Sequence, residues 1–501
     1  MKPIVSILLA FGFTSAAHAA APVGCAALMN IKPQGTAFEI IKAEGVPAAG
    51  AVPAHCRVDG VMDRRTGRDG KSYAIRFAVS LPGEWNGRFM FQGGGGLNGT
   101  LAPPLGGRFA GDTSSLAQGF AIASTDSGHN STGFDATFMD DQEAALNFLY
   151  QANAKVTVVA KQIVAAHYGR PSHHSYWVGC STGGREGMIM SQRFPDYFDG
   201  IVAGAPAMRT NYSNLALRWM ATNLNAIAPK DAQGRPETNK ALSERDRKLV
   251  IDGFLASCDA TDGTRDGLVF ATQSCRFDPH VLACKGEKSD DCLSTAQADA
   301  IARGMEGPKT SSGTQVYPGF YYDTGIANAR GLPGLLVGPV IPEGPAGTTT
   351  MDVDEAAAVA HDGRAMLGDT NAWTNLSSFR SRGGKLIFFH GVSDPWFSAV
   401  DTVQYYQRLE KDNAPAKAAD WSRLFLVPGM GHCAGGDATL DSFNMVDAIV
   451  NWVEKDTAPA QVIAKGTSMP GQTRPLCPFP KHAHYNGSGD EKSAASYQCM
   501  E

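Results

Sequence analysis

The stretch GCSTG at residues 179–183 lies between a predicted strand at residues 175–178 and a predicted helix at about residues 185–193. A G-x-S-x-G motif in this context is typical of a nucleophile elbow, a tight turn that lifts a serine hydroxyl above the edge of a sheet. Small residues suit such a turn because its backbone is strained. The stretch therefore predicts that Ser181 is a nucleophile, and a plain tight turn is the alternative.

Strands and helices alternate on both sides of this turn. This alternation predicts an α/β fold in which a parallel sheet is covered by helices on both faces. The expected strands lie at residues 73–79, 88–92, 121–125, 200–203, 385–389 and 423–427, and the expected helices at about residues 141–167, 399–410 and 442–454.

The alternation stops after residue 205. Residues 206–378 are rich in Gly, Pro, Asp and Cys and contain few periodic segments. So long a segment is not a loop inside one compact domain. We therefore expect a catalytic core of residues 20–205 and 379–501, split by an inserted lid domain at residues 206–378. The tail from residue 467 onward is expected to be irregular.

Composition narrows the class of protein. The chain has 501 residues, of which 43% are hydrophobic, so it can bury one large core and a second one. Its 44 basic and 49 acidic residues give a formal charge of -5, and no basic run is present. Nucleic acid is therefore not an expected partner. No apolar segment reaches the ~20 residues that span a bilayer, so no membrane partner is expected.

Residues 1–19 have the form of an export signal. Lys2 precedes an apolar stretch at residues 4–13, and Ala17-His18-Ala19 has the A-x-A form of a cleavage site. We therefore expect cleavage after Ala19 and a secreted or periplasmic protein. Both compartments are oxidising, so the 10 cysteines predict disulfides rather than free thiols or zinc ligands.

Local spacing suggests four disulfides, each of which closes a short loop. The suggested pairs are Cys25 with Cys56, Cys258 with Cys275, Cys284 with Cys292, and Cys477 with Cys499. This pairing leaves Cys180 and Cys433.

A serine nucleophile needs a general base and an acid that orients the base. In an α/β-hydrolase sheet these residues follow in the chain order Ser, Asp, His, on loops after later strands. Asp394 follows the expected strand at residues 385–389, and His432 follows the expected strand at residues 423–427. Both positions fall at the edge where a parallel sheet presents its active site. Two polar residues on surface loops are the alternative.

The two remaining cysteines flank these residues. Cys180 directly precedes Ser181, and Cys433 directly follows His432. A Cys180–Cys433 disulfide would bring the nucleophile and the base together. A purely structural disulfide is the alternative.

These residues predict hydrolysis of an ester through an acyl-enzyme. His432 would take the proton of Ser181, and Asp394 would hold the imidazole. The oxyanion would be bound by the N–H of Thr182 and by that of either Gly94 or Gly95. The glycine run is not a P-loop, because no Lys-Ser/Thr follows it.

The sequence resembles the tannase and feruloyl esterase family over nearly the whole mature chain. The resemblance rests on GCSTGGREG at residues 179–187, GIVAGAP at 200–206, the Asp394 loop and GHC at 431–433. It implies an α/β-hydrolase core with a large lid, a disulfide between the cysteines beside Ser181 and His432, and the four other disulfides as paired above. It also implies small substrates that are esters of aromatic acids: hydroxycinnamates, gallates or terephthalate monoesters.

A second site is suggested by the sequence CDATDGTRDGL at residues 258–268. Three aspartates in one short loop repel each other unless a hard cation gathers them, and oxygen ligands suit calcium. A cluster of Asp-Gly turns on the surface is the alternative. The resemblance implies a structural Ca²⁺ site in the lid and no organic cofactor. Its expected ligands are the side chains of Asp259, Asp262 and Asp266 and the backbone carbonyls of Thr264 and Leu268.

Three residues are candidates for substrate binding. Trp396 and Phe397 lie beside Asp394, and Arg330 is a candidate partner for the carboxylate of an acidic substrate. The insertion adds aromatic residues that either line the site or fill a core, namely Tyr317, Phe320, Tyr321 and Tyr322.

Two other functions fit the same residues. A secreted serine peptidase could use the same triad on the same fold. A non-catalytic, calcium-stabilised binding protein with a vestigial triad is the other alternative.

Overall fold

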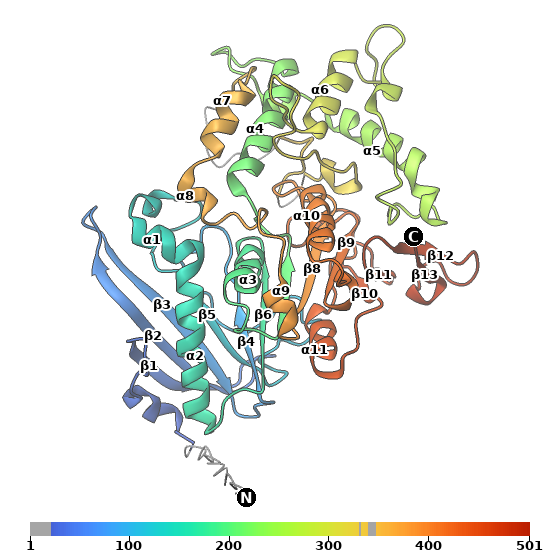
Figure 1. The fold of residues 1–501 in the computed structure, drawn as a ribbon. Helices are drawn as coiled ribbons and strands as arrows, with labels where there is room; N and C mark the ends of the chain where they lie inside the picture. Colours follow the sequence, from blue (N-terminus) through green and yellow to red (C-terminus); the bar gives the residue numbers. More distant parts are fainter. Residues whose placement is uncertain (1–21, 330–331, 339–346) are drawn as a thin grey trace, which may run out of the picture.

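The computed structural model describes residues 22–329, 332–338 and 347–501 (Figure 1). The expected signal peptide and Arg330 lie outside the described residues. A nine-stranded sheet in the order β1-β2-β3-β5-β4-β6-β7-β8-β9 forms the centre of the molecule. Its strands are β1 (Glu39–Val46), β2 (His55–Thr66), β3 (Ser72–Pro82), β4 (Arg88–Gln92), β5 (Ala121–Thr125), β6 (His174–Cys180), β7 (Gly200–Gly204), β8 (Lys385–Gly391) and β9 (Ser422–Val427).

The sheet is mixed rather than wholly parallel. Strands β5, β4, β6, β7, β8 and β9 run parallel to one another, as expected. The prediction was wrong at the other edge, where β1, β2 and β3 pair antiparallel and β3 also pairs antiparallel with β5. Strands β1 and β2 were not predicted, because charged residues interrupt their apolar positions and part of each strand faces solvent.

Helices cover both faces of the sheet, because neighbouring residues of a strand point to opposite sides. Phe388 of β8 packs on Tyr405 and Tyr406 of α10 and shares an apolar cluster with residues of α2 and α3 on one face. Ile387 and Phe389 lie in the cluster that includes α11 on the other face. The long expected helix is divided into α1, a π-helical turn at Asn147–Gln151 and α2. The helices of the core are α1 (Gln142–Leu146), α2 (Ala152–Tyr168), α3 (Thr182–Arg193), α10 (Ala399–Asp412) and α11 (Met445–Lys455).

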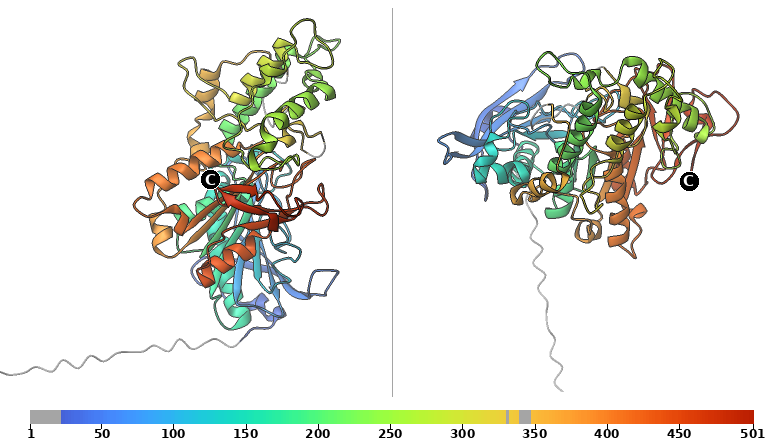
Figure 2. Two further views of the ribbon diagram at one scale, coloured as in Figure 1. Left: turned by 90° about the vertical axis from the view of Figure 1, so that its right-hand side faces the viewer. Right: turned by 90° about the horizontal axis from the view of Figure 1, so that it is seen from above.

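Between β7 and β8 the chain leaves the sheet, and this insertion lies beyond the carboxyl ends of the parallel strands (Figures 1 and 2). It has its own apolar cluster, which includes Leu217, Met220 and Ile301. The boundaries of the lid domain at residues 206 and 378 stay a prediction. The helices of the insertion are α4 (Thr210–Ile227), α5 (Glu244–Cys258), α6 (Thr295–Glu306), α7 (Val353–Ala360), α8 (Gly363–Met366) and α9 (Ser377–Ser381).

Two helices of the insertion begin with signals that the sequence carries. Ser243 and Asp246 form a capping box at α5, and Ser294 and Gln297 form another at α6. In a capping box, side chain and backbone satisfy each other's hydrogen bonds at the first turn of a helix. Within the described residues, no helix is long and apolar enough to cross a bilayer.

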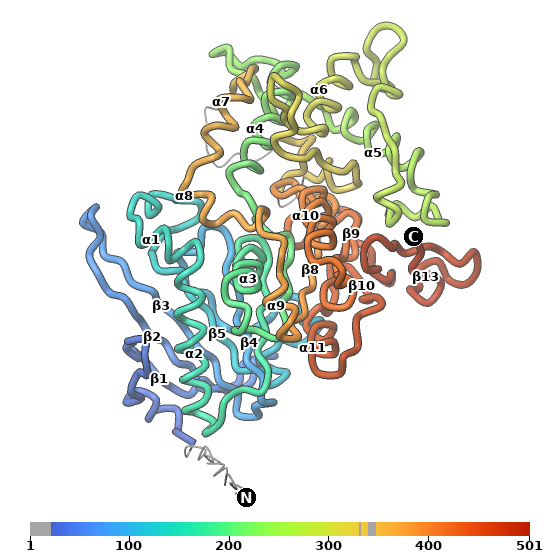
Figure 3. Tube along the Cα trace, in the orientation of Figure 1, coloured from blue at the N-terminus to red at the C-terminus, as the bar shows by residue number. Residues whose placement is uncertain are grey.

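The C-terminal tail is more regular than expected. It forms two small antiparallel sheets, so the prediction of an irregular tail was wrong. Figure 3 shows this tail beside the loop that follows α5, where Gly263 approaches His484 and Tyr485. The strands of these two sheets are β10 (Val462–Lys465), which lies just before the tail, and β11 (Thr473–Leu476), β12 (His482–Tyr485) and β13 (Tyr497–Met500) within it.

Five disulfides join the cysteines in the pairs expected from the sequence. The Cα atoms of Cys180 and Cys433 are 6.1 Å apart although 253 residues separate them in the chain. This bridge connects the end of β6 to the loop after β9. The other four pairs are Cys25–Cys56, Cys258–Cys275, Cys284–Cys292 and Cys477–Cys499.

Replacing both Cys180 and Cys433 with alanine should lower the free energy of unfolding by up to about 5 kcal/mol. The matched control is the double alanine variant of Cys477 and Cys499, whose bridge spans 22 residues. The chain-entropy cost of a shorter loop is smaller, so the control should lose about 2 kcal/mol less. Urea unfolding without reductant measures both, and an equal or larger loss in the control would contradict the expectation.

Candidate active site

Ser181 stands at the turn between β6 and α3. Its backbone has φ 64° and ψ -126°, a strained conformation that persists only where the surroundings hold it. The N–H of Ser181 donates to the carbonyl of Gly204 (3.0 Å), and its own carbonyl accepts from the N–H of Arg185 (3.0 Å). The strand–turn–helix expected for a nucleophile elbow is therefore present.

Two glycines of the motif allow three segments to approach closely. A Cβ at Gly179 would lie 2.5 Å from the carbonyl oxygen of Gly183, and a Cβ at Gly183 would lie 2.6 Å from that of Gly94. Neither position has room for a side chain, because real Cβ contacts are longer than this. The turn therefore packs directly against the glycine run at residues 93–96.

Asp394 and His432 form a buried pair. Nδ1 of His432 lies 2.7 Å from Oδ2 of Asp394, whose other oxygen accepts from the N–H groups of Trp396 (2.8 Å) and Phe397 (3.0 Å). Burial alone would raise the pKa of Asp394. The charge of His432 and the hydrogen bonds from His390 and His432 instead hold it well below its usual range. Asp394 is thus an anion that fixes the orientation of the imidazole.

His390 is a further buried contact of Asp394 that was not predicted from the sequence. Its Nε2 lies 3.3 Å from Oδ2 of Asp394 and 2.9 Å from the carbonyl oxygen of Phe397. Its Nδ1 lies 2.8 Å from the hydroxyl of Thr402. The signal in the sequence was its place at the end of the expected strand, four residues before the acid.

His432 keeps one nitrogen free. Its Nε2 is buried and has no hydrogen-bond partner in the described part of the chain. The rings of Trp396 and Phe397 lie 5.0 and 5.3 Å from its own ring, centroid to centroid. Ser181, next to the disulfide that also holds His432, is only 9% exposed. Catalytic hydrogen bonds often close only when substrate binds, so this arrangement suits a base awaiting a proton.

Of the two candidate oxyanion glycines, Gly95 alone has an N–H without a partner in the part of the chain that the structure describes. The N–H of Gly94 donates to Oε2 of Glu186 (2.9 Å). Among the described residues, no hydrogen bond uses the N–H of Gly95 or that of Thr182. The geometry therefore favours Gly95 over Gly94 as the second donor to an oxyanion.

Glu186 holds the glycine run, although no motif in the sequence marks it for this role. The side chain is 1% exposed, and its Oε1 accepts from Nδ2 of Asn98 (2.8 Å). The hydroxyl of Thr182 donates to the carbonyl of Gly96. Two side chains at the start of α3 thus bind the glycine run, one at Gly94 and the other at Gly96.

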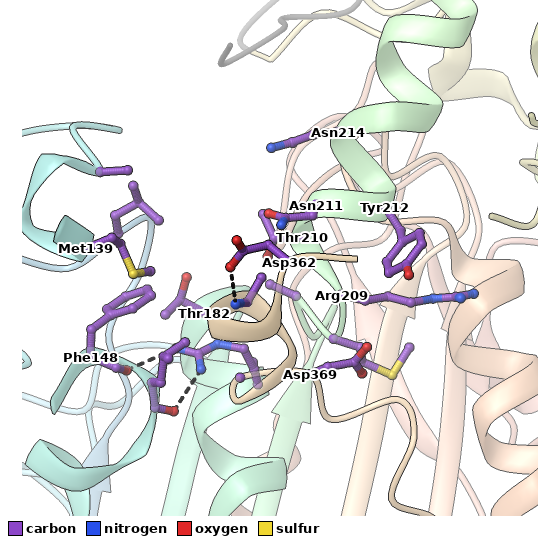
Figure 4. A pocket seen from close by; sticks show the side chains of 18 of the residues that line it. Met139, Phe148, Thr182, Arg209, Thr210, Asn211, Tyr212, Asn214, Asp362 and Asp369 are labelled. Carbon is purple, nitrogen blue, oxygen red and sulfur yellow. Dashed lines mark hydrogen bonds between the residues drawn. The ribbon is translucent and has the colours of Figure 1, made fainter. Parts of the chain in front are cut away.

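A cavity of about 350 Å³ opens beside Ser181 (Figure 4). Figure 4 shows Met139 and Phe148 of the core on one side and Tyr212 of α4 on the other. The predicted residues Trp396 and Phe397 line it. The aromatic residues of the insertion named from the sequence do not line it in the described structure; Tyr317 and Phe320 are instead buried in the apolar cluster of the insertion.

The arginines in the wall of this cavity have partners. Arg209 pairs with Asp401 at 2.5 Å, and Arg364 lies 3.6 Å from Asp362. Arg185 is 4% exposed and donates to the backbone carbonyls of Leu149 and Phe148. The cavity wall is therefore mainly apolar and aromatic near Ser181, with charged groups that are already paired or hydrogen-bonded.

The aspartate loop of the insertion, residues 258–268, holds buried carboxylates with few basic side chains nearby. Asp266 pairs with Arg474, but in the described part of the chain no Lys or Arg nitrogen lies within 4.0 Å of Asp259 or Asp262. Burial, with the charges of Asp266 and Asp259, raises the pKa of Asp262 to about 7. The residues therefore fit a divalent cation in oxygen type and in charge.

Not every feature of this loop favours a cation. The carboxylates accept backbone N–H groups in turns, from Gly267 to Asp259 (3.1 Å) and from Phe270 to Asp262 (2.8 Å). Elsewhere among the described residues, His173, His174 and Glu454 bring three possible ligand atoms within 4.8 Å. That cluster is not a convincing metal site, because Arg88 and Tyr176 already bind the carboxylate of Glu454.

The family model described as "Tannase and feruloyl esterase" matches residues 56–339 and 347–500. The chain belongs to the tannase and feruloyl esterase family. It is 39% identical to mono(2-hydroxyethyl) terephthalate hydrolase of Piscinibacter sakaiensis, over 91% of this chain and 86% of that protein. It is similar to an esterase from Aspergillus oryzae (26% identity, TM-score 0.77, 95% and 99% of the two chains) and to feruloyl esterase B from the same organism (25%, 0.74, 92% and 97%).

This member of the tannase and feruloyl esterase family is a carboxylic ester hydrolase with an α/β-hydrolase fold. The resemblance read from the sequence motifs is thereby confirmed. The family match also covers most of the insertion, up to residue 339 and again from residue 347, so the helices beyond the sheet are part of the family architecture.

Substituting Glu186→Gln in this esterase should lower kcat by about 10- to 100-fold with little change in KM, because a misplaced oxyanion donor acts on the transition state. Glu454→Gln is the matched control, since Glu454 also bridges core elements through Arg88 and Tyr176. Steady-state kinetics on an aromatic acid ester measure both variants. Equal kcat values in the two would contradict a role for Glu186 in holding the loop.

Proposed function

We propose that the protein is an exported serine esterase that hydrolyses small esters of aromatic acids through an acyl-enzyme. The main support is the free Nε2 of His432, which is buried beside the Ser181 turn and backed by Asp394. A buried imidazole nitrogen without a partner is costly unless it serves a purpose. Accepting the serine proton is the purpose that this geometry suits.

In the proposed reaction, Nε2 of His432 takes the proton of Ser181 while the oxygen of Ser181 attacks the ester carbonyl. The N–H groups of Thr182 and Gly95 stabilise the negative oxygen of the tetrahedral intermediate. The imidazolium then protonates the leaving alkoxide, and the alcohol departs. Water, deprotonated by His432, attacks the acyl-enzyme, and the imidazolium then returns this proton to the oxygen of Ser181 as the acid departs. Asp394 stays ionised throughout and stabilises the imidazolium.

The aromatic acyl group is proposed from the cavity and from the names of relatives. Phe134, Phe148, Trp396 and Phe397 line the cavity next to Ser181, and flat aromatic walls favour a flat acyl group. Relatives are named for terephthalate monoester and feruloyl ester hydrolysis. A hydroxycinnamoyl, galloyl or terephthalate monoester is therefore the proposed substrate class.

Export is proposed from the signal-like start of the sequence and from the disulfides. All ten cysteines are paired, which suits an oxidising compartment such as the periplasm or the medium. The insertion is proposed to act as a lid, because Tyr212 and Arg364 of this segment line the cavity together with Ser181.

The lid is further proposed to hold a structural Ca²⁺ in the loop at residues 259–268. Asp259, Asp262 and Asp266 would supply carboxylate oxygens, and Thr264 and Leu268 would supply backbone carbonyls. Arg474 balances one of the three charges, so a divalent cation would balance the other two. Such an ion would neutralise carboxylates and take no part in the chemistry at Ser181.

Substituting Ser181→Ala should lower kcat by at least about 10³-fold, because it removes the nucleophile. Ser191→Ala is the control, since Ser191 is a buried serine of α3, the helix that follows Ser181, and its hydroxyl donates to the carbonyl of Met188. Both are tested on methyl ferulate, methyl gallate, a hydroxyethyl terephthalate monoester and a peptide amide. Hydrolysis of the peptide alone would favour a peptidase, and no hydrolysis at all would favour a binding protein.

Excess chelator should lower the melting temperature, and added Ca²⁺ should restore it. A cation that binds only the folded state stabilises it by about 2.7 kcal/mol at a concentration of 100 Kd. Asp262→Asn should abolish the response to chelator. Asp246→Asn, which changes a buried lid carboxylate that pairs with Lys288, should keep it. An unchanged melting temperature of the unmodified protein in chelator would end the calcium proposal.

A further inference from the structure

The carboxylate of Asp323, in the insertion, contacts the loops that carry Asp394 and His432. Asp323 directly precedes the short 3₁₀-helix Thr324–Ala327 and is 1% exposed. Burial raises its pKa to about 6, although hydrogen bonds from Ser393, Gly429 and Thr324 act in the opposite direction. A buried carboxylate is expensive to retain, so its contacts call for an explanation.

Those contacts lie on the two loops that carry the acid and the base. Oδ2 of Asp323 accepts from the hydroxyl of Ser393 (2.6 Å) and from the N–H of Gly429 (2.6 Å). Ser393 is the residue before Asp394, and Gly429 lies three residues before His432. One oxygen atom of the insertion therefore joins both loops.

The insertion also donates a hydrogen bond to the Ser393 hydroxyl. The N–H of Gly325 donates to Oγ of Ser393 (2.9 Å), while Ser393 donates to Asp323. A Cβ at Gly325 would lie 2.6 Å from Cβ of Ser393, so the two segments touch with no room between them. In the described residues, Asp323 has no Lys, Arg or His nitrogen within 4.0 Å, which leaves these donors to stabilise its charge.

We propose that Asp323 is a positioning residue, through which the insertion sets the distance and orientation of Asp394 relative to His432. The base loop is then held at both ends, at Gly429 by Asp323 and at Cys433 by the disulfide to Cys180. This inference rests on the proposed function and deepens it, because it makes the insertion part of the catalytic machinery as well as a wall of the cavity.

The expected consequence follows from geometry. Without Asp323, Ser393 and Gly429 lose a shared acceptor. The N–H of Ser393 still donates to the carbonyl of Met430 (3.0 Å), so the loops carrying Asp394 and His432 stay joined but less tightly held. A misplacement of about 1 Å in a catalytic group costs on the order of 100-fold in rate. Substrate contacts are unchanged, since Asp323 is not among the residues that line the cavity.

The test compares Asp323→Ala, Asp323→Asn and Ser393→Ala with the control Asp246→Asn. Asp246 is also a buried carboxylate of the insertion, but it binds Ser243 and Lys288 at the start of α5, away from the catalytic loops. For each variant, kcat and KM are measured on the best ester of the panel, well below its own melting temperature.

We expect Asp323→Ala to lower kcat by about 10- to 100-fold with KM within about 3-fold of the unmodified enzyme. Asp323→Asn should lower kcat by a smaller factor, because its amide oxygen still accepts from both donors. The double variant Asp323→Ala, Ser393→Ala should have nearly the same kcat as Asp323→Ala, since both substitutions remove the same hydrogen bond. Asp246→Asn should lower the melting temperature and leave kcat unchanged.

Three results would overturn the inference. A kcat within about 2-fold of the unmodified enzyme in Asp323→Ala, with only the melting temperature lowered, would assign Asp323 to lid stability alone. A raised KM with constant kcat would assign it to substrate binding. If Asp323→Ala does not fold, unchanged kcat in both Asp323→Asn and Ser393→Ala would decide against it. Failure of the proposed function is distinct, because the unmodified protein would then hydrolyse no ester.

Discussion

The covalent link between Cys180 and Cys433 is the constraint on which the site depends. It attaches the long irregular loop after β9 to the end of β6, with Cα atoms 6.1 Å apart. The strained turn at Ser181 lies between β6 and α3 and is held by backbone hydrogen bonds to Gly204 and Arg185, so the disulfide ties the loop that carries His432 to this turn. Hydrogen bonds then orient the imidazole through Asp394, and a side chain of the insertion braces the same loop from its other end.

Short apolar runs in the sequence correctly predicted the central strands of the sheet. Strands β4, β5 and β7 are short apolar runs buried on both faces, and the predicted ranges agree with the structure to within a residue. Strands β1 and β2 were not predicted, because many of their half-exposed residues are charged. The helices of the insertion were not predicted, because the segment is rich in Gly and Pro. The two capping boxes that mark the starts of α5 and α6 were overlooked.

The candidate triad was predictable, and the groups that support it were not. Ser181, Asp394 and His432 follow a known motif and chain order, and the flanking cysteines made their proximity an expectation. Glu186, His390 and Asp323 have no such signature. Glu186 meets Gly94 across 92 residues and Asp323 meets Ser393 across 70, so only the folded chain brings them together. The same contact of Glu186 distinguishes Gly95 from Gly94, which the sequence left open.

The position of the insertion within the sheet has a consequence for how the chain reaches its native state. Strands β7 and β8 are hydrogen-bonded neighbours, yet the whole insertion lies between them in the sequence. During synthesis β7 therefore emerges with an unpaired edge, and its partner follows only after the helices of the insertion. Exposed edges invite pairing with other chains, and such distant contacts form slowly. Early folding of those helices would bring the two ends of the insertion together, and would shorten the time for which the edge of β7 stays unpaired.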